Sequence, residues 1–405
     1  MHFQEKINRA PKYWLIISFI LNIVGLIALY SISQDQVVLS FSSRFTKFIF
    51  WFIPAIGVFV LFFYLPIKII HDYSYIALFI TFIFLFIPYF FEPIAGTHRW
   101  ISFGYLRFQP AEIMKWITVL GLSRYLSDQK LKLKNFSTII PPVLFTLIPF
   151  FIIAKQPDLG SAIIVFAPLI PLLFWVGVDT FYILCFLAPI FSILMAFHIF
   201  SFTIWVGIFA IILYLYKKNI LISLTLFFGN IFLGLLSPVI WNSLNSYQQG
   251  RILVFLDVTK DPLGAAYQVI QSQTAIGSGG FWGKGFGNGS QTHLKFLPEQ
   301  ETDFIFSVVG EEFGFLVVSI ILILFAILIL DMIQKAFKLS ERFSSLVLFG
   351  IAVIFMCHVF VNIGMTVNLL PVKGLPLPFL SYGGTFLVSC YAMLGLAMNM
   401  AVEEK

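Results

Sequence analysis

Ionisable residues are concentrated in one segment of this chain, which runs from Tyr247 to Gly314. A carboxylate can act as a general base, and Arg or Lys side chains can stabilise a group that gains negative charge. Long apolar runs with almost no charge surround this segment, and ionisable groups are expensive in such a chain. We therefore expect the chemistry to depend on some of the following side chains: Arg251, Asp257, Lys260, Asp261, Lys284, Lys295, Glu299, Glu301, Asp303, Glu311 and Glu312.

The overall composition excludes an ordinary soluble protein. Of the 405 residues, 60% are hydrophobic and 11% are charged, whereas about 25% are charged in a typical soluble domain. Runs such as 14–30, 48–65, 75–91 and 304–330 approach or exceed the roughly 20 apolar residues that a helix needs to cross a bilayer. Strands of alternating polarity are lacking, which argues against an outer-membrane barrel. The sequence predicts an all-α polytopic membrane protein.

The net charge of +6 does not indicate a nucleic-acid partner, because the basic residues are scattered along the chain. Scattered basic residues are typical of a protein embedded in membrane lipid, because its cytoplasmic loops carry an excess of Lys and Arg. The cysteines Cys185, Cys357 and Cys390 lie in apolar runs without metal-binding spacing and are interpreted as core residues. His198 and His358 have no companions at ligand spacing, so we interpret them in the same way.

Apolar stretches and the charges between them predict about 10–12 transmembrane helices in a single domain, residues 1–405. With the N-terminus in the cytoplasm, Lys130, Lys132 and Lys134 lie inside, and residues 242–303 form one large extracytoplasmic loop. An alternative for the crowded region 180–241 is one span with re-entrant or interfacial pieces. The expected helices cover about 14–33, 47–66, 74–91, 110–127, 138–154, 160–177, 180–198, 202–216, 220–241, 304–330, 343–367 and 380–401.

Two ionisable residues fall within an expected helix. Glu112 and Lys115 are three positions apart, which places them on one face of the helix at 110–127. An acid and a base within the membrane rarely face lipid, so we expect them to face a cavity in the bundle. A structural ion pair and a contact with substrate explain them equally well. Asp158 is expected to cap the helix at 160–177 or to line the same cavity, and capping is favoured.

Several short motifs stand in order along the chain, and together they resemble the SEDS (shape, elongation, division and sporulation) family. The resemblance covers most of the sequence. The motifs are Arg99-Trp100-Ile101, Phe108-Gln109-Pro110-Ala111-Glu112, Gln156-Pro157-Asp158-Leu159-Gly160, Asp261-Pro262-Leu263-Gly264, Gly310-Glu311-Glu312-Phe313-Gly314, Leu370-Pro371-Val372 and Leu377-Pro378-Phe379-Leu380-Ser381-Tyr382-Gly383-Gly384.

The resemblance implies a peptidoglycan glycosyltransferase that polymerises lipid II at the outer face of the bacterial cytoplasmic membrane. It also implies a partner, a class B penicillin-binding protein whose transpeptidase crosslinks the glycan strands. Two motifs favour the elongation branch of the family: Ala275-Ile276-Gly277-Ser278-Gly279-Gly280 and Gly283-Lys284-Gly285. A division-type member with the same chemistry is the alternative within the family.

By the family pattern, the essential acid is the Asp of Asp-Pro-x-Gly, which is Asp261 here. A carboxylate beside the attacking sugar hydroxyl would remove its proton as a general base. Taken alone, Asp261-Pro262 is typical of a turn, but within the family pattern the base is favoured. Asp257 is a weaker candidate for the same role.

The leaving lipid diphosphate needs positive charge, supplied by Arg, Lys or a divalent cation such as Mg²⁺ or Mn²⁺. Glu299 and Asp303 are candidates to bind such a cation or a partner loop, or they favour the positive N-terminus of the next helix, and the metal ligands are otherwise undetermined. Lys373 stands where the family usually has a small hydroxyl residue, and this departure removes no proposed catalytic group. A lipid II flippase or transporter is the alternative function, because charges within a many-helix bundle are also typical of transporters. The residues expected to contact substrate are Arg99, Glu112, Lys115, Arg251, Lys284 and Glu312.

Overall fold

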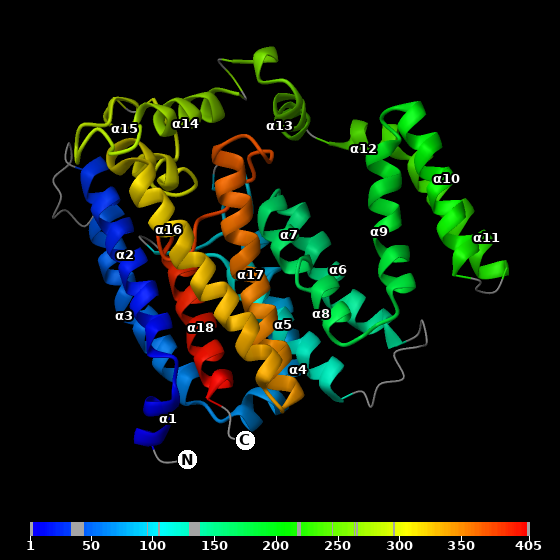
Figure 1. The fold of residues 1–405 in the computed structure, drawn as a ribbon, viewed down its shortest axis with the longest axis horizontal. Helices are drawn as coiled ribbons and strands as arrows, with labels where there is room; N and C mark the ends of the chain where they lie inside the picture. Colours follow the sequence, from blue (N-terminus) through cyan, green and yellow to red (C-terminus); the bar gives the residue numbers. More distant parts are fainter. Residues whose placement is uncertain are drawn as a thin grey trace.

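The computed structural model describes residues 3–33, 44–94, 96–103, 106–128, 138–216, 220–244, 246–262, 264, 266–294 and 296–402. Within these residues the chain is a bundle of helices with one two-stranded antiparallel sheet (Figure 1). The predicted all-α membrane fold is therefore confirmed, with a small hairpin that the sequence did not reveal. The lysine cluster expected in the cytoplasm, Lys130, Lys132 and Lys134, lies outside the described residues.

The elements follow one another in two halves. The first contains α1 (Phe3–Arg9), α2 (Lys12–Ile32), α3 (Arg44–Tyr64), α4 (Ile67–Phe84), η1 (Ile87–Phe90), β1 (Ile101–Phe103), β2 (Leu106–Phe108), α5 (Pro110–Asp128), α6 (Ile140–Lys155), α7 (Leu159–Phe166) and α8 (Leu169–Trp175). The second contains α9 (Thr180–Met195), α10 (Ile199–Leu215), α11 (Ile220–Leu235), α12 (Ser237–Ser243), α13 (Ser246–Leu256), η3 (Val258–Lys260), α14 (Tyr267–Ser278), α15 (Ser290–His293), α16 (Ile305–Lys338), α17 (Arg342–Thr366) and α18 (Gly384–Ala401).

Both termini lie at one end of the bundle, which we call the termini end (Figure 1). The helices α13, α14 and α15 lie across the opposite end, which we call the loop end. The segment expected as one large loop, 242–303, is therefore mostly short helices. Three parts of the chain position side chains at the loop end. They are the segment 242–303, the connection between α4 and α5, and the loop between α17 and α18, residues 367–383.

The C-terminal helix α18 lies at the centre of the main bundle and is largely buried. It packs closely along α3, which otherwise faces outward. A Cβ atom at Gly395 would lie 2.6 Å from the carbonyl oxygen of Phe59, so a larger residue would force the two helices apart. The pairing gives the bundle a rigid centre on which α5, α16 and α17 pack.

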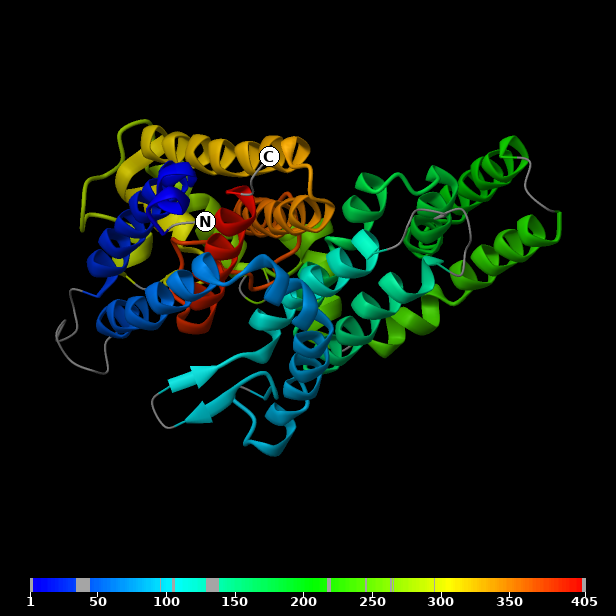
Figure 2. The same ribbon diagram turned by 90° about the horizontal axis from the view of Figure 1, so that it is seen from below.

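The helices α9 to α12 form a peripheral bundle beside the main one (Figures 1 and 2). Phe181, Ala188, Phe209 and Leu213 form its own small core, while most of its large apolar side chains are exposed. The expected single helix at 220–241 is wrong, because the chain bends by 43° between α11 and α12. Pro238, in the first turn of α12, cannot donate the backbone hydrogen bond that would continue α11.

Six helical segments of the described chain are long and apolar enough to cross a membrane, or seven if α11 and α12 form one bent span. The shorter apolar helices α6, α7 with α8, α9 and α10 occupy four more of the expected stretches. The remaining stretch is α5, which carries four charged residues within its 19 positions. The expected 10–12 spans therefore have helical counterparts, and their number stays a prediction.

Three further expected boundaries differ from the structure. The helix at 160–177 is broken into α7 and α8 before Pro168. The last helix begins at Gly384 rather than 380, because Ser381 accepts a hydrogen bond from Leu377 N and donates to Thr302 O within the 367–383 loop. The helix at 304–330 extends to Lys338.

Candidate functional site

Glu112 and Lys115 form a buried ion pair within the main bundle. The Lys115 ammonium lies 2.8 Å from Glu112 Oε1, and both side chains are at least 96% shielded from solvent. The same ammonium lies 3.4 Å from His358 Nε2 and 5.6 Å from the centre of the Phe386 ring. Glu112 Oε2 has no hydrogen-bond partner among the described residues. The pair therefore faces the interior as predicted, and it joins α5 to α17 and α18.

His358 is a core histidine as the sequence indicated, but it is not an isolated one. Its Nδ1 atom lies 3.1 Å from the carbonyl oxygen of Pro376, and its other ring nitrogen faces Lys115. This contact links the ion pair to the 367–383 loop. No spacing in the sequence reveals it, because α5 and α17 are more than 200 residues apart.

Asp158 caps α7, which confirms the favoured prediction. Its Oδ1 atom accepts a hydrogen bond from Ser161 N at 3.2 Å, and its Oδ2 atom accepts one from Gln109 Nε2 at 2.7 Å. Arg99 donates to the carbonyl oxygens of Gln156, at 3.1 Å, and Pro157. The guanidinium of Arg99 is therefore held against the turn that presents Asp158.

Arg251 projects from α13 onto the 367–383 loop, where its Nη1 atom donates to Val372 O at 3.0 Å. Asp303 lies next to the same loop, because a Cβ atom at Gly374 would stand 3.1 Å from Asp303 Oδ2. Asn362 Nδ2 fixes the local backbone by donating to Asp303 O at 2.8 Å and to Leu375 O at 2.7 Å. Residues from α13, α17 and the approach to α16 thus meet at the loop end.

The electrostatic environment of Asp303 is unusual for a carboxyl group. Desolvation, reinforced by Glu299 and Asp158, raises the pKa of Asp303 to about 7, although Arg251 and Arg99 oppose the shift. The side chain nevertheless keeps partial access to solvent. A carboxyl group that titrates near neutral pH has the proton affinity of a general acid or base. The sequence placed Asp303 among the charged side chains of the segment 247–314 but did not single it out as a general acid or base, because its desolvation depends on residues distant in the chain.

Asp261 occupies the turn that its sequence predicted. Its carbonyl oxygen accepts hydrogen bonds from Gly264 N at 3.3 Å and Ala266 N at 3.1 Å. A Cβ atom at residue 264 would lie 2.3 Å from Asp261 Oδ2, so the carboxylate folds closely over the glycine of the turn. The Asp261 side chain is exposed. The turn and the general base are therefore compatible, and the catalytic role stays a prediction.

Asp257, the weaker candidate for the base, has a local structural role. Its Oδ1 atom accepts from the backbone N of Thr259 at 3.1 Å and from its hydroxyl at 2.6 Å. These two hydrogen bonds cap η3. Asp257 therefore shapes the approach to the Asp261 turn.

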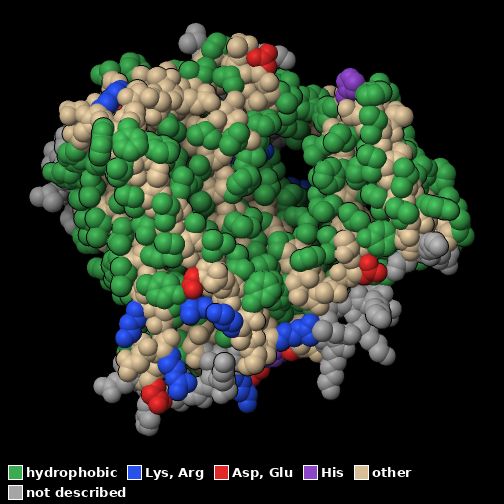
Figure 3. Space-filling view, viewed as in Figure 1, with side chains coloured by type: hydrophobic (Ala, Val, Ile, Leu, Met, Phe, Trp, Pro, Cys, Tyr) green, Lys and Arg blue, Asp and Glu red, His purple; other side chains and the backbone are tan. Residues whose placement is uncertain are grey.

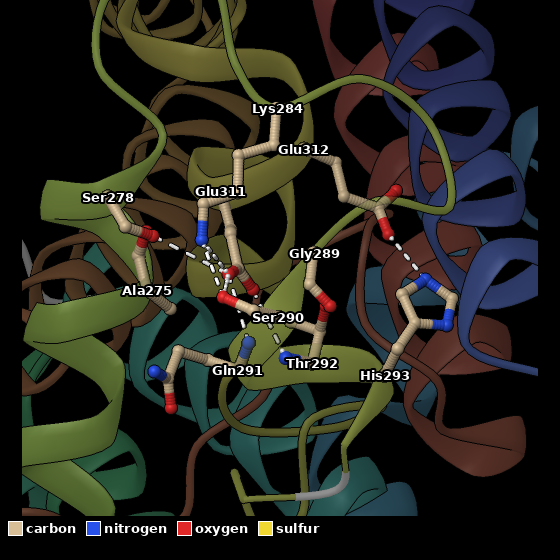
Figure 4. A network of polar contacts seen from close by, with 10 residues as sticks. All are labelled: Ala275, Ser278, Lys284, Gly289, Ser290, Gln291, Thr292, His293, Glu311 and Glu312. Carbon is tan, nitrogen blue, oxygen red and sulfur yellow. Dashed lines mark hydrogen bonds and ion pairs between the residues drawn. The ribbon is translucent and has the colours of Figure 1, made fainter.

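Lys284, predicted to contact substrate, is bound to Glu311. The Lys284 ammonium lies 2.7 Å from both Glu311 Oε1 and Ser290 Oγ, the contacts drawn as dashed lines in Figure 4. The Glu311 carboxylate is fully buried and also accepts hydrogen bonds from the backbone N atoms of Gln291, at 3.0 Å, and Thr292, at 3.1 Å. We call Lys284, Ser290, Gln291, Thr292 and Glu311 the Glu311 knot. Its charges are satisfied within the protein.

Glu312 points away from Glu311 and toward α2 (Figure 4). Its Oε1 atom accepts from Ser31 Oγ at 2.5 Å and lies 3.2 Å from His293 Nε2. Its side chain is fully buried. Glu312 therefore connects α2, α15 and α16, and the structure does not bring it together with Glu112 or Arg251 by any described contact.

Both glutamates precede a break in α16. Gly314 has φ = 73°, and a Cβ atom there would lie 2.2 Å from Gly283 N. The segment 280–285 fills the break, with Lys284 N and Gly285 N donating to the carbonyl oxygens of residues 311 and 312, both at 3.0 Å. Phe315 N donates to Gly280 O at 2.9 Å on the other side. A break in an apolar helix is tolerated because neighbouring backbone satisfies the freed groups in this way.

The sequence of the chain matches a family model over most of its length. The FtsW/RodA/SpoVE model, described as a cell cycle protein, matches residues 12–205 and 200–405. The chain belongs to the FtsW/RodA/SpoVE family. This confirms the family that the motifs indicated.

Two relatives illustrate the breadth of the match. The peptidoglycan glycosyltransferase MrdB of Escherichia coli K12 is 34% identical over 313 residues, covering 76% of this chain and 72% of MrdB. A probable peptidoglycan glycosyltransferase FtsW of Geobacter sp. strain M18 is 30% identical over 405 residues, covering 96% of each chain. The FtsW/RodA/SpoVE match thus extends to members named for both branches.

Two solved structures support the same fold. One, from work on the structural coordination of polymerization and crosslinking by a peptidoglycan synthase complex, has a TM-score of 0.72 at 24% identity and covers 97% of each chain. The rod shape determining protein RodA of Thermus thermophilus has a TM-score of 0.63 at 22% identity, covering 97% of this chain and 96% of RodA. At these identities the likeness concerns the fold.

A divalent cation was a sequence prediction, and the described residues do not provide a ligand set for one. Within them, no three His, Cys, Asp or Glu side chains are grouped closely enough to hold a metal ion. Mg²⁺ often binds through one or two carboxylates together with the phosphates of a substrate. The cation therefore stays a prediction, and we derive no catalytic step from it.

Proposed function

We propose that this chain is a peptidoglycan glycosyltransferase that polymerises lipid II into glycan strands during cell elongation. The observation that carries the proposal is the 34% identity with MrdB, which extends over three quarters of the chain. The clustering of Arg99, Arg251 and Asp303 at the loop end supplies chemistry that suits the reaction. A sugar hydroxyl must lose a proton, and a lipid diphosphate must leave with additional negative charge.

In the proposed mechanism, Asp261 accepts the proton of the attacking hydroxyl. Its carboxylate is exposed and folds over Gly264 in a turn that follows α13, the helix that carries Arg251. Arg251 and Arg99 stabilise the diphosphate as the bond to the sugar breaks. A divalent cation bound together with the substrate would add positive charge at the diphosphate.

The proposed orientation places the loop end outside the bacterial cytoplasmic membrane. Figure 3 shows Lys and Arg side chains gathered near the termini end of the face in view. Basic residues favour the cytoplasmic side of membrane proteins. The termini end therefore faces the cytoplasm, and the loop end faces the compartment in which cell-wall precursors are joined.

The proposed protein partner is a class B penicillin-binding protein that crosslinks the new strands. Support comes from the structural neighbour, which belongs to a complex described as coordinating polymerization and crosslinking. Several helices expose large apolar side chains, and a transmembrane helix of a partner could pack against them. Co-purification of the two full-length proteins, followed by a polymerisation assay of the complex, tests the pairing.

The first prediction tests the base. In the purified complex, Asp261→Asn should lower the rate of glycan-chain formation by about 100-fold or more, the usual contribution of a general base. Asp257→Asn tests the weaker candidate in the same segment, and the Asn side chain can still cap η3. It should leave the rate close to that of the wild type. Full activity of Asp261→Asn would refute the assignment, provided that both variants are folded.

The Glu112–Lys115 pair supports a second function, a lipid II flippase, because charged pairs within a helix bundle are frequent in transporters. A flippase moves labelled lipid II across vesicles without lengthening glycan. It should also tolerate loss of Asp261 better than loss of Lys115. Transport without polymerisation by the purified complex would favour this function over the enzyme.

A further inference from the structure

Lys373 lies in the 367–383 loop at the loop end and is partly buried. Across the described chain, its ammonium group makes no hydrogen bond and no ion pair. Taking a charge partly out of water without a partner costs free energy. A partly buried lysine without a partner therefore does not stabilise the fold, and its presence needs another explanation.

A second cation stands next to Lys373. Arg251 donates a hydrogen bond to the carbonyl oxygen of Val372, the preceding residue, at 3.0 Å. Desolvation lowers the pKa of Lys373, and the positive charge of Arg251 lowers it further. The fold thus holds two cations near each other in spite of their repulsion, which an anion between them would reverse.

The backbone holds Lys373 in place. Its carbonyl oxygen would lie 2.7 Å from a Cβ atom at Gly160, so the loop rests directly on α7. The next residue, Gly374, has φ = 62°, a conformation that favours glycine. The position from which the lysine side chain extends is therefore fixed before any ligand binds, which lowers the entropic cost of binding.

Two acidic groups lie near this part of the loop, Asp303 and Asp158. Asp303 is the carboxyl group beside Gly374, and its pKa of about 7 leaves it partly protonated at neutral pH. Asp158 is engaged by Gln109 and by the N-terminus of α7. No acidic group among the described residues pairs with Lys373 or offsets the lowering of its pKa.

We propose that Lys373 and Arg251 form a subsite for the diphosphate group of a lipid-linked substrate. Lys373 supplies a compact charge with three donors, and Arg251 supplies a planar set of donors suited to phosphate oxygens. When the bond between the sugar and the diphosphate breaks, the electron pair stays on the diphosphate, and both cations stabilise it. This subsite rests on the proposed function, because the enzyme must hold the donor through this group.

The second prediction tests the subsite with Lys373→Met, which removes the charge and keeps the length of the side chain. In the purified full-length chain, we expect weaker binding of undecaprenyl diphosphate, by about 10- to 100-fold, the range for hydrogen bonds to charged groups. Its melting temperature should rise, because a partly buried charge without a partner is removed. Lys373→Arg should bind nearly as well as the wild type.

Lys338→Met is the matched control, because Lys338 is a lysine in the last turn of α16 at the termini end. It should leave undecaprenyl diphosphate binding unchanged. Phosphatidylglycerol distinguishes a diphosphate site from general attraction to anionic lipid. An equal loss of phosphatidylglycerol binding in Lys373→Met would overturn the proposal, and so would unchanged binding of the diphosphate lipid.

The binding assay also separates this subsite from the enzymatic function. If Lys373→Met stops polymerisation while its affinity for the diphosphate lipid is unchanged, the subsite is wrong and the glycosyltransferase remains. If the wild type binds the diphosphate lipid through Lys373 but forms no glycan in complex with its partner, the subsite is supported and the polymerase is wrong.

Discussion

Two lysines at the loop end, Lys284 and Lys373, lie in opposite electrostatic environments. Lys284 contacts Glu311 and Ser290, and the carboxylate it meets is further held by backbone donors. Lys373 lies beside Arg251 and, among the described residues, has no acceptor for its ammonium. Charge that is satisfied within the protein holds the fold together, whereas charge left without a partner is available to a ligand.

The largest expected effect concerns the satisfied charges. Glu311→Ala should destabilise the protein by about 3–5 kcal/mol, because it leaves Lys284 and two backbone donors without their acceptor. Thermal unfolding in detergent measures the loss. Glu92→Ala, an exposed acid, is the control and should have little effect. If the Glu311→Ala protein keeps its stability but loses polymerisation, Glu311 serves the reaction rather than the fold.

The next effect separates Lys284 from Arg251. Lys284→Met should lower stability by about 1.5–3 kcal/mol, since hydrogen bonds to a charged group are lost, and should retain polymerisation well below the melting temperature. Arg251→Met should show the reverse, with little change in melting temperature and a polymerisation rate reduced by about 10-fold or more. Measuring both quantities for both variants decides the comparison. Loss of activity without loss of stability in Lys284→Met would restore the sequence prediction that Lys284 contacts substrate.

The smallest expected effect is a pH dependence centred on Asp303. The pKa of Asp303 is raised from 3.8 to about 7, so between these values the folded chain holds a proton that the unfolded chain has released. The resulting stabilisation is complete below a pH of about 4 and is lost as the pH rises through about 7. The melting temperature of the wild type, relative to Asp303→Asn, should therefore fall across this range. A flat difference would show that Asp303 is not desolvated by its surroundings.

Much of the fold was predictable because apolar length and charge are local properties of the sequence. Each expected apolar stretch has a helical counterpart, and Asp158 caps α7 as its position before a helix indicated. The break at Pro168 was missed, because a continuous apolar run conceals it, and the bend between α11 and α12 was covered only by the alternative of re-entrant or interfacial pieces in 180–241. Gly314 was missed for a different reason, since its break depends on the distant segment 280–285 filling it.

The candidate site was predictable only in part. Spacing alone placed Glu112 and Lys115 together, because three positions make one helical face. It did not reveal His358 beside Lys115, or Asn362 anchoring Asp303, because these partners come from other helices. The role of Lys284 illustrates the limit, since nothing near it in the sequence identifies Glu311 as its partner.

The sequence by itself determined the membrane-protein class, the family, most helices and the Asp261 turn. Apolar length, motifs and backbone preferences depend on residues that are close together in the sequence. Only the tertiary structure decided which charges are paired. The energy of a buried charge depends on every group within a few ångströms, whatever their separation along the chain. That is why Lys284 is part of a structural knot and Lys373 is free to meet a ligand, although the two residues are of one type at one end of the bundle.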